Sequence, residues 1–296
     1  MPVPIPRPAT LQQVEPAKFS LGWIKANRWN IATVCGILGL LAYCVFPFLW
    51  LVRLSMDPSA SGALFPKSIN FTNYNDVLHN ASFLAAFKNS MIISGSATVI
   101  AMSIGGCAGY ALGRLPVPGR QYILFFALSV SMFPSISVVG PLFNLWRTLG
   151  LFDTKLGLII PNVTFALPMS IWIMSSFFKE LPRDLEQAAY MDGATPFQAF
   201  RKIMLPLAAP GVFTAAIIVF VSSWNEFLFA LSFSATDRSR TATVAIQFFQ
   251  GKSGSYEIPV GAISAASVVM MIPVVVLVLV FQKRIVAGLT SGGVKG

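Results

Sequence analysis

Few residues in this 296-residue chain could take part in chemistry, and most candidates lack the spacing that a reaction requires. Cys35, Cys44 and Cys107 lie in apolar runs and form no CxxC pair, so we interpret them as buried membrane thiols. His79 has no metal-ligating neighbour at useful spacing and is interpreted as a solvated loop residue, so no metal site is expected. The sequence contains no GxxxxGK[ST] motif, so the chain itself is not expected to hydrolyse ATP.

One carboxylate is unusual, because Glu226 is the only acid inside a long apolar run. Acids within membrane spans are costly and indicate function by default. Glu226 lies about 19 residues beyond Leu207, or roughly 29 Å along a helix, near the outer end of the predicted span. It either lines an outer cavity or marks a solvated helix end. Aromatic neighbours could stack on a sugar or anchor at the membrane interface. The candidate translocation-path residues are Trp224, Asn225, Glu226 and Phe227.

The densest polar stretch is the segment Leu181–Pro206, which separates two apolar runs. Pro182 is suited to the first turn of a short helix, and Gly193 is placed to end that helix in a left-handed cap. Thr195 is a good N-cap for a second helix, predicted to end before Pro206. The first helix has one slim face, formed by Leu185, Ala188, Ala189 and Asp192. Either a partner protein binds this face or the segment is a plain interfacial loop.

The composition predicts the environment of these segments. Hydrophobic residues make up 55% of the chain, charged residues 11%, and the mean hydropathy is +0.70. Soluble domains carry about 25% charged residues, so this chain is predicted to be an integral membrane protein. The formal charge of +10 usually reports orientation in such proteins. No basic run is interleaved with base-stacking aromatics, so nucleic-acid binding is not expected.

Apolar runs long enough to cross the roughly 30 Å hydrocarbon core define the predicted fold. The third run is broken by Pro134 and Pro141. The polar stretch Leu181–Pro206 falls between the fourth and fifth runs. The fold class is therefore all-α, a polytopic membrane protein with six transmembrane helices. The predicted spans are Ile31–Val52, Ser90–Leu112, Tyr122–Leu145, Leu156–Phe178, Leu207–Phe233 and Val260–Phe281.

The positive charges predict the orientation. With the N-terminus inside, 13 of the 21 Lys and Arg residues fall in inner segments and 8 in outer ones. Both termini and the segment Leu181–Pro206 are therefore predicted to be cytoplasmic. The long outer segments Ser55–Asn89 and Ala235–Pro259 either contact an external partner or serve as connectors.

The polar stretch resembles the EAA loop of ABC-importer permeases, whose pattern is E-A-A, three residues, G, nine residues, I-x-L-P. The motif falls here on Gln187-Ala188-Ala189, Gly193, Ile203 and Leu205-Pro206, with matching spacing throughout. One position departs from the pattern, because Gln187 stands where the motif has glutamate. If a carboxylate matters on this helix, Glu186 or Asp192 must provide it.

Other stretches are similar to the sugar-importer branch of this family, close to the smaller permease subunit of maltose and trehalose importers. They are Gly109–Arg114 with Pro118–Arg120, Ser131–Ser137, Met191–Pro196, Trp224–Phe227, and the C-terminal stretches Gln282–Ser291 and Gly288–Gly296. The resemblance covers the chain from about Ile31 onward. It implies a cytoplasmic N-terminal segment 1–30, a first span with its outer loop 31–85, a type-1 permease core 86–281 and a cytoplasmic tail 282–296.

The resemblance also implies a mechanism, in which two ATPase subunits close on ATP and move a coupling helix at about Arg183–Asp192. The spans then alternate access as rigid bodies. The implied partners are a second homologous permease subunit, an ABC ATPase dimer, an extracytoplasmic sugar-binding protein and membrane lipid. The chain is then no enzyme and binds no cofactor, since ATP and Mg sit on the ATPase subunits. The implied coupling residues are Asp184, Glu186, Gln187, Ala188, Ala189, Asp192, Gly193, Ala194 and Pro196.

The expected function is therefore import of a sugar, a di- or oligosaccharide such as trehalose or maltose, across the cell membrane. Three alternatives stay open. An ABC permease for a non-sugar solute would share the same loop. An ion-coupled secondary transporter should show midplane charges and paired repeats, and the sequence shows neither. A membrane scaffold would not depend on the helix Ala188–Gly193 for uptake.

Overall fold

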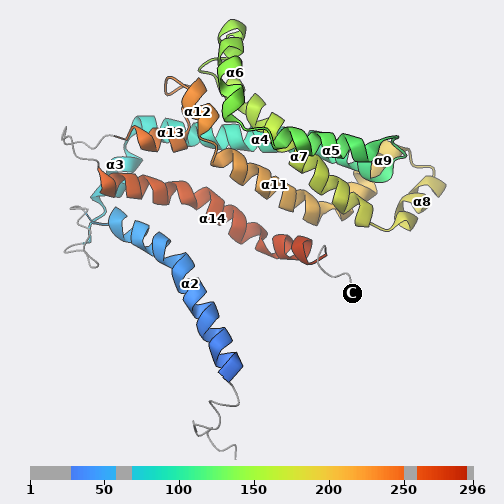
Figure 1. The fold of residues 1–296 in the computed structure, drawn as a ribbon, viewed down its shortest axis with the longest axis horizontal. Coiled ribbons are helices and arrows are strands. Elements are labelled where there is room, and N and C mark those ends of the chain that lie inside the picture. The colour runs from blue at the N-terminus through green and yellow to red at the C-terminus, as the bar shows by residue number, and fades with distance from the viewer. Residues whose placement is uncertain (1–27, 58–68, 250–258, 292–296) are drawn as a thin grey trace, which may run out of the picture. The chain divides into compact units, whose positions relative to one another are not determined.

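The computed structural model describes residues 28–57, 69–249 and 259–291. These ranges are helical and contain no β-strand, which confirms the predicted all-α class (Figure 1). Residues 1–27 of the predicted N-terminal segment and 292–296 of the predicted tail lie outside the described residues. The helices are α2 Arg28–Ser55, α3 Thr72–Leu78, α4 Ala81–Arg114, α5 Arg120–Ser131, α6 Ile136–Leu149, α7 Lys155–Glu180, α8 Arg183–Met191, α9 Pro196–Ala199, the π-helix η1 Phe200–Met204, α10 Leu205–Leu207, α11 Ala209–Trp224, α12 Leu228–Phe233, α13 Ala242–Gln247 and α14 Val260–Ser291.

The membrane spans agree with a polytopic protein. Within the described ranges, four segments are single helices long and apolar enough to cross a membrane, and two bent helix pairs raise the number to six if each pair is one span. The single-helix spans are Ala32–Ser55, Ala81–Arg114, Lys155–Glu180 and Val260–Gln282. The chain divides between Trp50 and Leu51 into two units, and the helices from α3 to α14 all belong to the second.

The third predicted span consists of two helices. The axes of α5 and α6 meet at 86°, and the break contains Pro134, as the sequence predicts. A proline has no backbone N–H to donate and disfavours helical geometry in the residue before it. Pro141 has a different outcome, since it lies inside α6 without ending the helix.

The fifth predicted span, Leu207–Phe233, is wrong as a continuous helix. It bends by 77° between α10 and α11, and α11 ends at Trp224. A new helix, α12, begins at Leu228, because the Glu226 carboxylate accepts hydrogen bonds from the N–H groups of Phe229 (2.7 Å) and Ala230 (3.0 Å). A side chain that binds the next turn's free N–H groups competes with continuation of the preceding helix.

Helices α4, α7 and α11 pack together, and α13 and α8 lie at opposite ends of these helices (Figure 1). The α4–α7 contact is close because glycines on α4 face α7. A Cβ atom built at Gly105 would lie 2.8 Å from Ser170 Cβ, and one at Gly109 only 2.6 Å from Met174 Cβ. Small residues allow such backbone approach in membrane helices.

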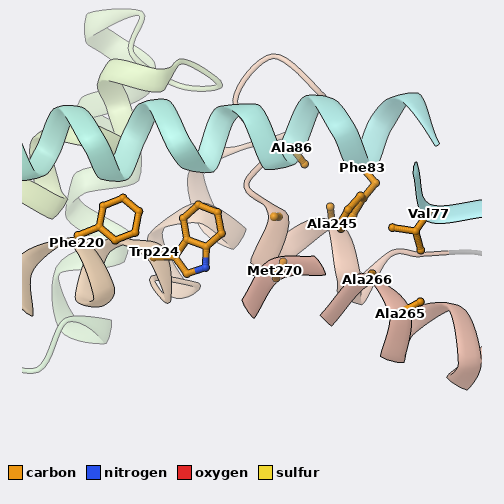
Figure 2. Close-up of a cluster of buried hydrophobic side chains, with 10 residues drawn as sticks. Val77, Phe83, Ala86, Phe220, Trp224, Ala245, Ala265, Ala266 and Met270 are labelled. Atoms are coloured by element: carbon orange, nitrogen blue, oxygen red, sulfur yellow. The ribbon is translucent and has the colours of Figure 1, made fainter. Parts of the chain in front are cut away.

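The described residues of the second unit form three buried hydrophobic clusters, and Figure 2 shows the one that joins α3, α4, α11, α13 and α14. Trp224 belongs to this cluster, where its ring meets Phe87 edge-on at 5.6 Å and stacks on Phe220 at 5.7 Å. A second cluster joins α4, α6, α7, α12 and α13. The third, around Tyr110, Phe178 and Phe200, lies where α4 and α7 end beside η1, and it supports the α8 loop.

Candidate functional site

The α8 loop, residues 181–208, begins with the predicted short helix. Pro182 precedes the first turn of α8, and Asp184 and Glu186 lie in that turn, at the positive end of the helix dipole. Gly193 has φ +81°, and its N–H donates to the Tyr190 carbonyl, which confirms the predicted left-handed cap. An L-residue with a side chain is strained at this φ, so the glycine is required for the turn.

The second helix starts as predicted and ends differently. Thr195 Oγ1 accepts from Gln198 N–H (3.3 Å) while Gln198 Oε1 accepts from Thr195 N–H (2.9 Å), a complete capping box. The predicted end before Pro206 is wrong, since the chain continues through η1 and α10 to Leu207. A proline ring clashes with the carbonyl four residues earlier in an α-helix, and the π turn, in which Leu205 N–H donates to Phe200, adds a residue there.

The two faces of α8 have different surroundings. Glu186 and Ala189 are buried against the fold, and Met191 at the end of the helix is 89% exposed. The sequence placed Ala189 on the slim face with Leu185, and the structure turns it inward. Gly193 and Pro196 are exposed just beyond the helix, and Ala194 is half-buried. The remaining exposed residues of α8 and its C-cap are Arg183, Asp184, Leu185, Gln187, Ala188, Tyr190 and Asp192.

The Glu186 carboxylate is held inside the fold by three side chains. Its Oε2 accepts from Arg114 Nε at 2.9 Å, and its Oε1 accepts from the hydroxyls of Tyr110 (2.5 Å) and Tyr190 (3.0 Å). Burial raises the pKa of Glu186, but the hydrogen bonds from Tyr110, Tyr190 and Arg114 and the charge of Arg114 outweigh it and lower the pKa below its ordinary value. The carboxylate is therefore ionised at neutral pH and its contacts are internal.

A cavity of about 380 Å³ lies at the break between α11 and α12, within the range of about 300–1,000 Å³ that small-molecule sites occupy. Ser223 contributes a buried hydroxyl that has no hydrogen-bond partner among the described residues. Asn162 donates its amide N–H to Leu158 O within its own helix. The polar and aromatic lining consists of Ser135, Asn162, Ser222, Ser223, Glu226, Phe165, Phe227 and Phe229.

Two of the four candidate path residues line this cavity and two do not. Glu226 and Phe227 line it, whereas Trp224 packs in the core and Asn225 is exposed, donating to Val221 O. Sequence reasoning missed Asn162 as a lining residue. A polar amide in the middle of an apolar span was the signal that could have found it.

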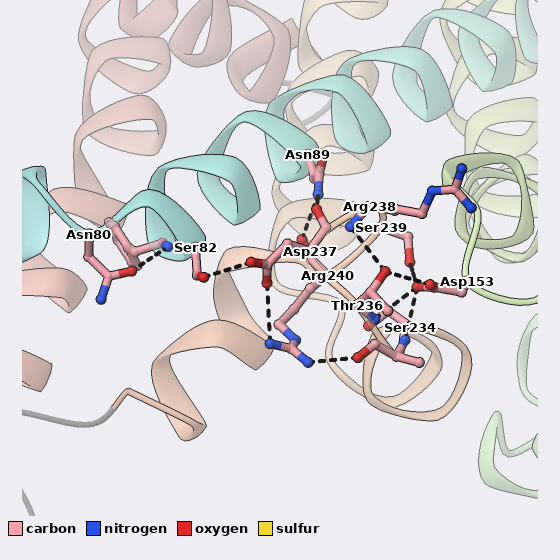
Figure 3. Close-up of polar contacts among 12 residues, drawn as sticks. Asn80, Ser82, Asn89, Asp153, Ser234, Thr236, Asp237, Arg238, Ser239 and Arg240 are labelled. Carbon is pink, nitrogen blue, oxygen red and sulfur yellow. Dashed lines mark hydrogen bonds and ion pairs between the residues drawn. The ribbon is translucent and has the colours of Figure 1, made fainter.

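At the end of α4 and α7 that lies away from α8, a hydrogen-bond network holds the start of the α12–α13 connection (Figure 3). Asp153, in the α6–α7 turn, accepts from Ala235 N–H (3.0 Å), from Thr236 N–H (3.1 Å) and Oγ1 (2.6 Å), and from Ser239 Oγ (2.7 Å). Asn89 of α4 donates to the carbonyls of Asp237 and Arg240. This network fixes residues 235–240 of the predicted outer loop Ala235–Pro259, of which 250–258 lie outside the described residues.

Comparison with known proteins gives the family. Residues 105–291 match the model of the binding-protein-dependent transport system inner membrane component. The chain is 51% identical over 279 residues to the trehalose transport system permease protein SugB of Mycobacterium tuberculosis, covering 93% of this chain and 100% of that protein. It is 43% identical over 272 residues to the trehalose/maltose transport system permease protein MalG of Thermococcus litoralis, covering 90% and 97%.

A solved structure has the same fold. A chain from the crystal structure of a bacterial ABC transporter involved in the import of the acidic polysaccharide alginate superposes with a TM-score of 0.72 at 24% identity, covering 91% of this chain and 100% of that one. Several of its helices are apolar enough to cross a membrane, so this chain is a multi-pass membrane protein. Its similarity to permease proteins shows that it is a transmembrane subunit and not itself an enzyme. The chain therefore belongs to the family of binding-protein-dependent transport system inner membrane components and is a transmembrane permease subunit of an ABC importer.

Proposed function

We propose that this permease imports a disaccharide of the trehalose or maltose type, and that separate ATPase subunits drive it by binding the exposed face of α8. The exposed α8 face carries the proposal. It is a short helix, ended by the left-handed turn at Gly193, with the small side chain of Ala188 outward, next to Leu185 and the exposed Met191. Such a face fits a shallow groove on another protein, in the manner of an amphipathic helix in an apolar groove.

The sugar class rests on two separate observations. The relatives with 51% and 43% identity are named for trehalose and for trehalose/maltose transport. The cavity beside Glu226 combines hydroxyl and amide groups with the rings of Phe165, Phe227 and Phe229, and aromatic faces with a few convergent polar groups suit a sugar. We assign Glu226 and Phe227 to the translocation path of this subunit.

The proposed assembly contains this chain, a second homologous permease subunit, an ABC ATPase dimer and an extracytoplasmic sugar-binding protein, all within or against the cell membrane. A solved relative of the same fold is described in complex with an alginate pentasaccharide-bound periplasmic protein. ATP and Mg belong to the ATPase subunits in this proposal. The α8 loop faces the cytoplasm, and residues 235–240 face the binding protein.

The experiment is to purify the complex carrying Ala188→Arg and to measure co-purifying ATPase subunits and uptake of labelled trehalose and maltose into proteoliposomes. An arginine on the slim face prevents close approach, so we expect the ATPase subunits and uptake to be lost while the chain still inserts. The matched control is Ala81→Arg, the same exchange at an exposed position at the other end of α4, which should keep the ATPase subunits.

Normal ATPase attachment and normal uptake in the Ala188→Arg complex would refute docking through this face. Uptake by this chain alone, driven by an ion gradient, would support the secondary-transporter alternative instead. If a wild-type complex transports neither disaccharide but does transport another class of solute, the sugar assignment is overturned and the ABC mechanism stands.

A further inference from the structure

Four side chains connect α8 to the last turns of α4. Tyr110 and Arg114 project from α4, and Glu186 and Tyr190 lie one turn apart on α8. Both oxygens of the Glu186 carboxylate are occupied, by the hydroxyls of Tyr110 and Tyr190 on one side and by Arg114 Nε on the other. The Arg114 and Glu186 side chains are only 3% and 11% exposed. Ion pairs of this kind hold firmly when their hydrogen bonds are complete, and removal of one partner is disruptive.

The Arg114 guanidinium also binds the link between α7 and α8. Its NH1 donates to the Leu181 carbonyl at 2.9 Å and its NH2 to the Pro182 carbonyl at 3.1 Å. One side chain of α4 therefore binds both the carboxylate of α8 and the backbone that leads into α8. The planar fork of arginine suits this arrangement, and a lysine ammonium could not reproduce it.

An aromatic cluster lies beneath this ion pair. The Tyr110 ring packs edge-on against Phe178 of α7, with ring centroids 5.5 Å apart, and lies tilted against Phe200 of η1, with centroids 4.9 Å apart. Its hydroxyl points to Glu186, so this tyrosine contacts three other elements of the loop and its surroundings. By contrast, non-helical breaks at Leu181–Pro182 and Gly193–Thr195 separate α8 from its neighbours along the chain. The side chains of α4 therefore add a direct link from α8 to a membrane-spanning helix, beyond the contacts of α8 with α9 and η1.

We propose that Tyr110, Arg114 and Glu186 are positioning residues that fix α8 to α4, so that a displacement of α8 by the ATPase subunits moves α4 directly. The close glycine contacts then carry the movement from α4 to α7. This inference rests on the proposed docking of α8. It also assigns Glu186 an internal role, so its carboxylate does not replace the glutamate of the motif, whose position Gln187 occupies. The exposed acids of the loop are Asp184 and Asp192.

The test uses the full complex in proteoliposomes and measures trehalose transported per ATP hydrolysed, or maltose if that is the sugar the wild-type complex transports. Glu186→Gln removes the charge at almost constant volume, and Tyr110→Phe removes one hydroxyl. We expect both variants to keep the ATPase subunits and to lower the transport ratio at least about fivefold, the lower end of the usual range for coupling between sites. Glu180→Gln is the control, the same exchange at the exposed end of α7, and should leave the ratio unchanged.

A double variant separates positioning from general damage. If the ion pair acts as a unit, Arg114→Gln combined with Glu186→Gln should lower the ratio no further than the worse single variant. A wild-type ratio in assembled Glu186→Gln and Tyr110→Phe complexes would overturn the proposal. If Glu186→Gln does not assemble, Tyr110→Phe decides the matter by the same criterion. Failure of docking is seen separately, since Ala188→Arg is read by ATPase attachment and the positioning variants by the ratio.

Discussion

Asp153 joins two connections of this fold that lie far apart in the sequence. Its φ of +55° is uncommon for a residue with a side chain, and its N–H donates to the Phe233 carbonyl at 2.9 Å. Burial raises the pKa of the carboxyl, but hydrogen bonds from the Thr236 and Ser239 hydroxyls and from the N–H groups of Thr236 and Ala235 outweigh it and lower the pKa to about 2. The α6–α7 turn and the α12–α13 connection are thereby joined through one ionised group (Figure 3).

We expect Asp153→Asn to destabilise the protein by about 2 kcal/mol, because several donors lose a charged acceptor. A group with a lowered folded-state pKa stabilises fully above its unfolded value and loses that contribution as the pH falls through its folded value. The difference in melting temperature between wild type and variant should therefore be constant above about pH 5 and shrink as the pH falls from about 4 toward 2. Thermal unfolding in detergent across this range checks it, and a difference that grows on acidification would contradict it.

At the scale of elements, the α4–α7 contact depends on particular glycines of α4. The sequence pattern alone does not distinguish them from glycines of the same helix that packing does not require. A Cβ at Gly109 would lie 2.6 Å from Met174 Cβ and 2.9 Å from the Ser175 backbone nitrogen, whereas one at Gly106 meets nothing within 4 Å. Both residues lie on the same helix, three positions apart. They therefore form a matched pair in which only one glycine is required by packing.

Gly109→Ala should destabilise the isolated subunit by about 1–3 kcal/mol, the usual range for overpacking, because the two backbones must separate. Gly106→Ala should be neutral or stabilising by up to about 1 kcal/mol, since alanine favours helix and nothing obstructs it. Thermal unfolding of both variants in the same detergent gives the comparison. Equal effects of the two substitutions would show that the close approach at Gly109 is not what holds α4 against α7.

The elements that the sequence predicted correctly depend on local contacts. The left-handed cap at Gly193 and the capping box at Thr195 involve residues within a few positions of one another. The features that the sequence did not predict depend on distant or competing contacts. Glu186 turns inward because Arg114, 72 positions away, binds it. The break at Glu226 arises because its carboxylate binds the next turn, a competition that hydrophobic length does not register.

At the scale of the whole molecule, the helix directions of the second unit and the basic residues of the full chain bear on its orientation in the membrane. Helix α4 runs from the α13 end to the α8 end, and α7 runs in the same direction beside it (Figure 1). The α8 end carries a cluster of basic residues, namely Arg114, Arg120, Lys179, Arg183, Arg201 and Lys202. Cytoplasmic segments near membrane spans are enriched in Lys and Arg. Because 13 of the 21 Lys and Arg residues fall on the α8 side when the N-terminus is placed inside, we propose that the α8 loop lies inside and residues 235–240 outside.

This orientation places two exposed arginines on opposite sides of the membrane, namely Arg201 beside α8 and Arg238 in the network around Asp153. A cysteine at each position should therefore react with an external reagent differently. Each arginine is changed to cysteine in a background where Cys35, Cys44 and Cys107 are serine. A membrane-impermeant maleimide added to intact cells should label Arg238→Cys at once and Arg201→Cys only after permeabilisation, because the reagent cannot cross the bilayer. The serine background should stay unlabelled in both conditions. The reverse pattern would place α8 outside and remove it from reach of any ATPase subunit in the cytoplasm, and labelling of both sites in intact cells would mean that the chain inserts in two orientations.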